Sequence, residues 1–499
     1  MTLARDRAYH HKLVIGQRAR PGTFAAKIWH QSATQNNRPD VQDMTTWNDA
    51  FAPIRIEPPE RPLWGLRWLR TVVANPMEAW PAAIYREPFV VARSMGRNVV
   101  FVAAPELIRE VLLNQAEVFQ KGELSERTLK PVLGEAILTA DGAHWRWQRR
   151  AAAPAFRPEH VFALVPSILA AADRRRAAWQ ALPEGAEINL SHEMMRTTFD
   201  VILDALLMGR DSLDAEGIEK AITGYLSSTG WMMAIALLRL PPWLPYPGAR
   251  AARRARLHLR DVAAMAVRRV RENRSGAGRL MTLLAAATDP STGRAMDDQD
   301  LADNFLTFMA AGHETTALAL TWTFYLLSLH PAAEQRILAE IENVTGGEPV
   351  TAEHVPRLSF TGQVIQEAMR LYPPAPVIAR VPRREITLAG QVIAPGTLTY
   401  IPTYAVHRHA LLWDDPDRFD PERFAPHVAE ARDRYAYLPF GAGPRTCIGM
   451  SFALAEAAAI LATLLRSFHL RLRPAYRPRM KMQVTLRPAG GMPMRLSPR

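Results

Sequence analysis

The sequence predicts a mainly α-helical protein with small β-sheets, built as a single large domain. Helical periodicity of apolar residues runs through most of positions 158–274, and a long, almost continuously apolar stretch follows at 297–330. Short runs rich in β-branched and aromatic residues, such as 89–92 and 398–401, lie next to glycine-containing turns and predict strands. Because 48% of the 499 residues are hydrophobic, the chain can bury a sizeable core.

The first 50 residues look unlike the remainder of the chain. They are polar and lack sustained periodicity, which predicts a disordered N-terminal extension over 1–50 and a folded domain over 51–499. Up to Asp43 this extension carries seven Lys or Arg residues against three Asp residues, a net charge of +4. We expect it to be dispensable for folding, with Met44 as a candidate start of the native protein.

Periodicity and turn signals place the other elements in chain order. Strands are expected in a hairpin, 89–92 with 99–102, and at 386–388 and 398–401. A proline-rich break at 241–248 precedes a very arginine-rich helix, for which a solvated surface is the simplest interpretation. Further helices are expected at 64–80, 105–118, 334–342, 361–371 and 450–457, and from Gly142 onward.

Charge and cysteine content narrow the classes of function. The net charge of +12 favours an acidic partner or an anionic surface, but no nucleic-acid-binding motif is present and no nucleic acid is expected. The single cysteine excludes an intrachain disulfide and fits a reducing compartment. No stretch of 18 uninterrupted apolar residues and no signal-peptide pattern is present, so we expect no transmembrane segment and a cytoplasmic location.

The only cysteine, Cys447, lies where a turn enters a helix. Gly441, Gly443 and Pro444 precede it, so the backbone can turn tightly and approach a ligand closely. A helix N-terminus, loop N–H groups and the nearby Arg445 favour a thiolate over a thiol. A buried structural cysteine is the plainer alternative for a lone cysteine. A dinucleotide-binding loop is excluded, because no third glycine follows at the required spacing.

The stretch Phe440-x-x-Gly443-x-Arg445-x-Cys447-x-Gly449 resembles the haem-ligand loop of the cytochrome P450 superfamily. The resemblance implies the cytochrome P450 fold over about 51–499 and haem b, iron protoporphyrin IX, as cofactor. It also implies that Cys447 is the axial thiolate ligand of the haem iron and that Phe440 contacts the cofactor.

Two further stretches, and Arg445 of the cysteine loop, match cofactor-binding positions of the same family. Trp145 and Arg149 are four residues apart and share one helix face, and the resemblance implies that they bind a haem propionate. Arg380, which follows a proline-rich segment, and Arg445 correspond to further propionate ligands. His407 is more simply interpreted as a structural histidine than as a haem contact.

The buried helix at 297–330 contains Ala311-Gly312-His313-Glu314-Thr315-Thr316. A zinc-protease motif is excluded, because position 317 is alanine where His-Glu-x-x-His needs a second histidine. The stretch resembles the oxygen-activation motif of the P450 family, which makes Glu314 and Thr315 the catalytic acid–alcohol pair. Ala311 would leave room for O2 beside the cofactor.

The helix face before Thr315 is expected to look into a substrate pocket. Thr307, Phe308 and Ala311 lie on that face, and Val377 is expected to add to the pocket from the segment before Arg380. Further candidate stretches are 129–138, 225–240 and 490–492. Their apolar content suits a terpenoid, a fatty acyl chain, a steroid or an aromatic compound.

Glu367 and Arg370 form a Glu-x-x-Arg pattern, which alone indicates only a helix-surface ion pair. Together with Arg423 in Pro421-Glu422-Arg423-Phe424, it resembles the buried Glu-Arg-Arg network of the P450 family. We expect this network to be structural and to fix the segment that carries the cysteine loop.

The resemblance implies a monooxygenase that inserts one oxygen atom of O2 into a small apolar organic substrate. The short stretch after Cys447 leaves no room for a fused electron-transfer domain, so we expect two electrons from a separate ferredoxin or flavodoxin with its reductase. Arg432, Arg434 and Arg445 could steer such acidic partners. The alternatives are a peroxygenase of the same fold that uses peroxide, and a non-catalytic haem-binding sensor or carrier. The intact Glu314–Thr315 pair argues against the peroxygenase, and a gas-binding carrier would not need Thr315.

Overall fold

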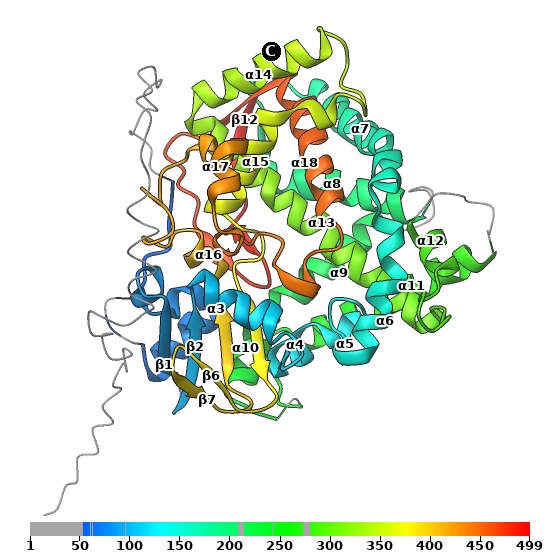
Figure 1. The fold of residues 1–499 in the computed structure, drawn as a ribbon. Helices are drawn as coiled ribbons and strands as arrows, with labels where there is room; N and C mark the ends of the chain where they lie inside the picture. Colours follow the sequence, from blue (N-terminus) through cyan, green and yellow to red (C-terminus); the bar gives the residue numbers. More distant parts are fainter. Residues whose placement is uncertain are drawn as a thin grey trace, which may run out of the picture.

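The computed structural model describes residues 53–499 except 60, 62, 95, 208–213, 242 and 273–279. The expected N-terminal extension and the candidate start at Met44 lie outside the described residues. Within them, helices predominate, and the small sheets lie toward one end of the molecule and along one side (Figure 1).

Helices account for most of the regular secondary structure, which confirms the predicted mainly α-helical class. The α-helices are α2 (Gly65–Ala74), α3 (Pro105–Arg109), α4 (Glu123–Thr128), α5 (Lys130–Leu133), α6 (Gly142–Ala152), α7 (Pro158–Gln180), α8 (Leu190–Leu207), α9 (Ala215–Ser227), α10 (Thr229–Leu237), α11 (Ala249–Glu272), α12 (Leu280–Ala286), α13 (Asp298–Leu329), α14 (Pro331–Thr345), α15 (Ser359–Leu371), α16 (Thr403–Val406), α17 (Pro426–Ala431) and α18 (Met450–Leu465). No helix among the described residues is long and apolar enough to cross a membrane.

The strands form a five-stranded sheet in the order β1-β2-β8-β5-β3, a three-stranded sheet in the order β4-β12-β9, and two hairpins, β6-β7 and β10-β11. The predicted first hairpin is confirmed, with Phe89 opposite Val102 and Ser94 opposite Arg97. The strands are β1 (Phe89–Ser94), β2 (Arg97–Val102), β3 (Phe119–Gln120), β4 (Glu187–Asn189), β5 (Ile378–Pro382), β6 (Ile386–Leu388), β7 (Gln391–Ile393), β8 (Leu398–Ile401), β9 (Phe468–Leu472), β10 (Met480–Met482), β11 (Leu486–Pro488) and β12 (Pro493–Pro498).

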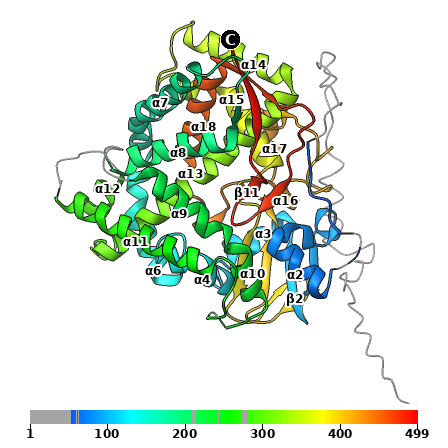
Figure 2. The same cartoon turned by 180° about the vertical axis from the view of Figure 1, so that it is seen from behind.

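Helix α13 runs through the middle of the molecule, as both views show (Figures 1 and 2). It begins at a capping box, in which Asp297 accepts from the backbone N–H of Asp300 and the Asp300 side chain accepts from Asp297. It ends at His330, directly before Pro331, which cannot continue the ladder. Because helices α8, α11, α15 and α18 pack around it, most of its side chains are buried, as the apolar pattern predicts.

Two helix predictions are wrong in extent. The helix expected at 64–80 ends at Ala74, because the residue before a proline disfavours helical geometry, and Asn75 is extended with φ of −158° before Pro76. A separate 3₁₀ turn, η1 (Pro76–Ala79), follows. The helix expected at 105–118 continues past α3 only as a π-helical turn, η3 (Glu110–Asn114).

Candidate active site

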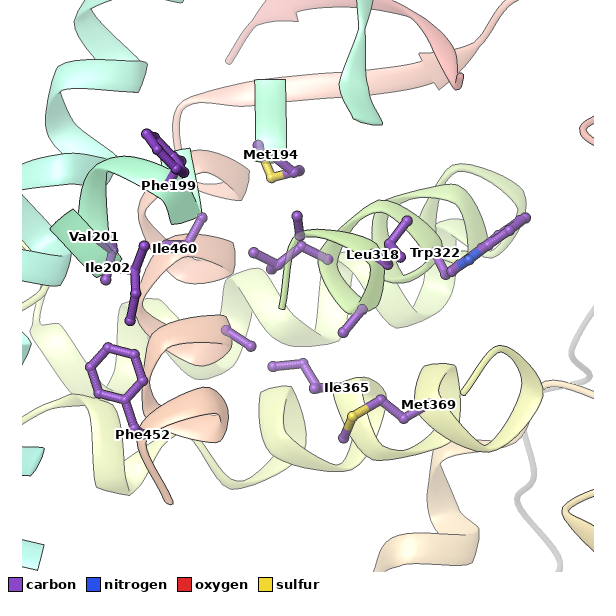
Figure 3. Close-up of a cluster of buried hydrophobic side chains, with 14 of the residues drawn as sticks. Met194, Phe199, Val201, Ile202, Leu318, Trp322, Ile365, Met369, Phe452 and Ile460 are labelled. Carbon is purple, nitrogen blue, oxygen red and sulfur yellow. The ribbon is translucent and has the colours of Figure 1, made fainter. Parts of the chain in front are cut away.

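The cysteine loop, the middle of α13 and the start of α18 enclose a cavity of about 410 Å³. Its walls are mostly apolar, and helices α6, α8 and α15 also contribute side chains. Figure 3 shows Ile202 on α8, Ile365 and Met369 on α15, and Phe452 on α18, four of the lining residues, within the core cluster that surrounds α13. The hydrophobic core is therefore continuous with the cavity wall.

The cysteine loop is held by backbone geometry. Gly443 adopts φ of 70°, and a Cβ atom there would lie 2.0 Å from the carbonyl oxygen of Leu112, so only glycine fits this approach. The backbone N–H of Cys447 donates to the carbonyl of Phe440 at 2.9 Å, which closes the loop. Both side chains line the cavity, and the Cys447 side chain is exposed into it just before α18 begins.

The protein around Cys447 does not make its thiol ionise more easily than an ordinary one. Burial by the surrounding protein raises its pKa, while a backbone hydrogen bond involving Gly449 and the charge of Arg149 oppose that rise. The sequence predicts that the helix start and a neighbouring arginine lower this pKa, and both contributions are present. The arginine is Arg149 and not Arg445, and burial outweighs both contributions.

Four cationic side chains line the cavity: Lys121, Arg149, Arg380 and Arg445. Burial is the largest cause that lowers the pKa of each, and for Arg380 it lowers the pKa to about 10. No carboxylate lines the cavity in the described part of the chain. Asp141, beside it, forms an ion pair with Arg445 and accepts from the backbone N–H of Lys121 at 3.1 Å.

This excess of buried positive charge fits a group that carries carboxylates. Trp145 lines the same cavity, and the guanidinium of Arg445 lies 4.2 Å from the centre of its ring. Haem b carries two propionates, so the cation set, the apolar walls and the Cys447 sulfur together fit this cofactor. The sequence identified every member of this set except Lys121, which no motif marks.

One face of α13 forms part of the cavity wall. Thr307, Phe308, Ala311 and Thr315 all line the cavity, as the spacing predicts, and the hydroxyl of Thr315 donates to the carbonyl of Ala311 at 2.8 Å. Gly312 also lines it, and a Cβ atom there would lie 2.8 Å from Cδ1 of Ile202. The glycine therefore serves close packing of α8 on α13.

Glu314 does not line the cavity in the described part of the chain, although its neighbour Thr315 does. Its carboxylate is buried on another side of α13, where it accepts from the hydroxyl of Thr485 and forms an ion pair with Arg487. The two groups of the expected acid–alcohol pair therefore face different surroundings. Nothing in the sequence motif indicated the β10-β11 hairpin as the partner of this carboxylate.

The structure brings Glu367, Arg370 and Arg423 together, as predicted. Arg370 donates from Nε and Nη2 to the two Glu367 oxygens at 2.6 and 2.8 Å, and both side chains are fully buried. Nε of Arg423 lies 3.7 Å from Glu367, so this third member is more loosely associated. The backbone N–H of Asp420 also donates to Glu367, at 2.8 Å.

His407 joins this network to the cysteine loop. Its backbone carbonyl accepts from Arg370 at 2.8 Å, and its ring Nε2 accepts from the backbone N–H of Leu438 at 2.7 Å. Leu438 lines the cavity two residues before Phe440. Burial lowers the pKa of His407 to about 3, with a further contribution from the charge of Arg370. The interpretation of His407 as a structural histidine agrees with these contacts.

The expected substrate stretches contribute unequally. Ile137 and Leu138 line the cavity from the 129–138 stretch, but no residue of 225–240 or 490–492 does so within the described chain. Val377 is not among the lining residues either, whereas its neighbour Ile378 is. Lining residues that the sequence did not indicate include Val161, Leu164, Ile202, Ala205 and Leu280, which come from helices α7, α8 and α12.

A cysteine sulfur that faces an apolar cavity lined by four cations and no carboxylate in the described chain fits the class of haem-thiolate proteins, and comparisons with known proteins give the family. The family model described as Cytochrome P450 matches residues 67–493. The haem domain of cytochrome P450DA, known from a crystal structure, has a TM-score of 0.77 and 25% identity, covering 89% of this chain and 97% of that one.

Curated relatives agree with this match. The cyclooctat-9-en-7-ol 5-monooxygenase of Streptomyces melanosporofaciens is 34% identical over 433 residues, which cover 84% of this chain and 92% of the relative. The pentalenene oxygenase of Streptomyces avermitilis is 32% identical over 373 residues, covering 74% and 81%. The chain belongs to the cytochrome P450 family. It is a haem-dependent monooxygenase that uses haem b, O2, an organic substrate and an electron donor.

Proposed function

We propose that this protein inserts one oxygen atom of O2 into a terpenoid. The observation that carries the proposal is a single cavity in which the Cys447 sulfur and the Thr315 helix face meet mostly apolar walls. Two relatives support the substrate class, since their names describe oxidation of cyclooctat-9-en-7-ol and of pentalenene. The names of these two relatives do not point to the alternatives, a fatty acyl chain, a steroid or an aromatic compound.

The residues of the cavity divide between holding the cofactor and holding the substrate. Cys447 would ligate the iron, and Arg149, Arg380, Arg445, Lys121 and Trp145 would bind the propionates by charge-assisted and indole hydrogen bonds. Phe440 and Ala311, which line the same cavity, would also contact the cofactor. Thiolate-ligated haem supplies the activation of O2, a reaction that consumes two electrons and two protons and yields the oxygenated product and water.

Thr315 is proposed to hold a proton donor at the reacting end of the cavity. Its hydroxyl Oγ1 donates to the Ala311 carbonyl in the structure and can turn to donate into the cavity in its place. Glu314 is proposed to relay a proton taken up from solvent to that hydroxyl, because its carboxylate is buried on another side of α13 with Thr485 and Arg487 as partners. The apolar walls exclude bulk water, which keeps these protons under the control of the two side chains.

We propose a separate ferredoxin or flavodoxin with its reductase as the electron donor, in a cytoplasmic setting that suits the lone thiol. The structure changes the set of steering charges. Arg445 points into the cavity, and Arg432 is half-buried against the rings of Trp413 and Phe424. Of the three arginines expected to steer the partner, only Arg434 is exposed. The rate at which the partner reduces the protein should therefore fall with added salt. At the same low salt concentration it should be lower in Arg434→Ser than in wild type.

The first test is the absorption spectrum of the reduced protein with carbon monoxide, for wild type, Cys447→Ala and the matched control Ser451→Ala on the exposed first turn of α18. Wild type and Ser451→Ala should share a strongly red-shifted Soret band that Cys447→Ala lacks. A band at the position of histidine-ligated haem in wild type would contradict ligation by Cys447.

The second test separates the three functions considered. Wild-type protein is incubated with a terpene and either NADPH, ferredoxin and ferredoxin reductase, or hydrogen peroxide alone. Product that depends on the electron donor supports the monooxygenase with a separate partner. Efficient product formation with peroxide alone would favour a peroxygenase, and binding without product under both conditions would favour a carrier.

A further inference from the structure

Thr307 has a buried hydroxyl group without a hydrogen-bond partner in the described chain. It lies on α13, lines the cavity, and is almost fully buried. Its Oγ1 atom has no hydrogen-bond partner among the described residues. A buried hydroxyl without a partner lowers stability, so a helix interior normally satisfies it or replaces it with an apolar group.

Other threonines of the same helix show the usual solution. Thr315, Thr321 and Thr323 each donate to the carbonyl four residues earlier, at 2.8, 2.7 and 2.7 Å. Thr307 makes no such bond to Asp303. The two buried threonines that lie toward the end of α13, Thr321 and Thr323, do not line the cavity. The exception therefore lies at a position that a ligand can reach.

No group of the described residues lies at hydrogen-bonding geometry to the Thr307 hydroxyl. The cavity wall also includes Phe308, whose ring lies 5.3 Å from that of Phe156, and aliphatic side chains of α7 and α8. The charged lining residues, by contrast, belong to the cofactor-binding set around Cys447. Thr307 precedes Thr315 by two helical turns, or about 12 Å along the axis, which separates it from the reacting end.

We propose that Thr307 is a specificity-determining residue that hydrogen-bonds an oxygen already present on the substrate. The inference rests on the proposed terpenoid monooxygenase function and narrows its substrate to terpenoids that carry a hydroxyl or carbonyl group. Threonine in a helix populates two side-chain rotamers, so rotation about Cα–Cβ can turn the now buried hydroxyl toward the ligand. A hydroxyl serves either chemistry, because it donates to a carbonyl and both donates to and accepts from an alcohol.

The test uses a matched pair of ligands, a terpene hydrocarbon and the alcohol with the same carbon skeleton. Both are titrated into haem-loaded wild type, Thr307→Val, Thr307→Ser and the control Thr323→Val, and dissociation constants are read from the Soret spin-state shift. Valine matches threonine in shape but lacks the hydroxyl, whereas serine keeps it. Thr323→Val removes a buried hydroxyl of the same helix away from the cavity.

We expect the ratio of hydrocarbon to alcohol dissociation constants to fall about three- to tenfold in Thr307→Val relative to wild type. Thr307→Ser and Thr323→Val should keep the wild-type ratio, and all four proteins should show the same carbon monoxide spectrum. A ratio unchanged in Thr307→Val, while the hydrocarbon still binds, overturns the inference and leaves the terpenoid function intact. If neither ligand shifts the spectrum of wild type, the proposed substrate class fails and the inference fails with it.

Discussion

Two buried charge clusters of this protein differ in how their charges are balanced. In the network around Glu367, a fully buried carboxylate meets the fully buried Arg370 through two hydrogen bonds, and backbone groups complete the remaining positions. Arg370 also donates to the carbonyls of His407, Pro416 and Arg418. In the cavity, four cations line the wall, only Arg445 of them forms an ion pair within the described chain, with Asp141, and the lining residues there include no carboxylate.

This difference separates a structural cluster from a binding site. A buried ion pair tolerates loss of water only when its partners satisfy each other, and the Glu367 network does so within the protein. The cation cluster is costly without a ligand, because burial lowers the pKa of every member. It becomes favourable when carboxylates arrive. Buried charges whose partners are present in the protein therefore form a structural cluster. Buried cations that lack enough negative charge mark the place where the cofactor binds.

The largest expected effect is on stability, through Glu367→Gln. The substitution leaves the buried guanidinium of Arg370 without its counter-charge, and we expect the free energy of unfolding to fall by about 3–5 kcal/mol. Urea unfolding followed by circular dichroism measures the change. The matched control is Glu216→Gln, which removes the exposed ion pair with Lys220 and should leave the unfolding midpoint unchanged.

An equal, small loss in both variants would contradict the structural role assigned to Glu367. It would mean that water reaches Arg370 in the variant and replaces the missing carboxylate. The Glu367 network would then tolerate the loss of one partner as an exposed ion pair does, and it would not be a structural cluster.

The second expected effect concerns His407, which accepts from Leu438 only as a neutral ring. Burial lowers the pKa of His407 to about 3, below the ordinary 6.5, so between these values the unfolded chain binds a proton that the folded protein does not. Stability from this residue is complete above pH 6.5 and is lost as the pH falls toward 3. The loss amounts to roughly 3 kcal/mol at pH 4.

The measurement is the unfolding free energy of wild type and His407→Gln at pH 7 and pH 4. The glutamine carbonyl can accept from Leu438 but does not titrate, so the variant should lose roughly 3 kcal/mol less than wild type between the two values. Equal losses would show that the imidazole is not held neutral. The Glu367 network would then reach the cysteine loop by some other contact.

Much of the fold could be predicted because its signals are local. The apolar stretch of α13, the hairpin around Gly96 and the proline break before α11 all depend on nearby residues, and the structure contains each of them. The errors arise where one residue changes the backbone geometry, as at Asn75 before Pro76, or where short strands depend on distant partners. Strand β5, which pairs with β8 and β3, was not predicted for that reason.

The site could be predicted where a motif fixes both residue and spacing. Cys447, Arg445 and Thr315 fall into this group, and all three line the cavity. Lys121 could not be identified, because its position beside Asp141 depends on a long-range approach of the chain. Likewise, the sequence places Glu314 next to Thr315, but the partners that turn its carboxylate away come from the β10-β11 hairpin.

The smallest expected effect is that of Arg380→Leu, which tests whether the cavity cations bind the cofactor. The substitution should stabilise the haem-free protein and weaken haem retention in the haem-loaded protein. Arg380→Leu removes a buried cation whose pKa is lowered to about 10 by burial and by the charge of Arg445. Without haem, the variant should unfold with a free energy about 1–2 kcal/mol greater than wild type, since an incompletely compensated charge is gone. With haem, it should release the cofactor to apomyoglobin about tenfold faster, because a propionate has lost a charged donor.

Asp141→Asn is the counterpart, because it removes the carboxylate that compensates Arg445. The haem-free protein should become less stable than wild type, while the haem-loaded protein should keep its cofactor at least as long, since Arg445 is freed to bind a propionate. If both substitutions shift stability and haem retention in the same direction, the cations are structural in the manner of the Glu367 network. If the two measurements move in opposite directions for each variant, the charge imbalance is itself the recognition element for the cofactor.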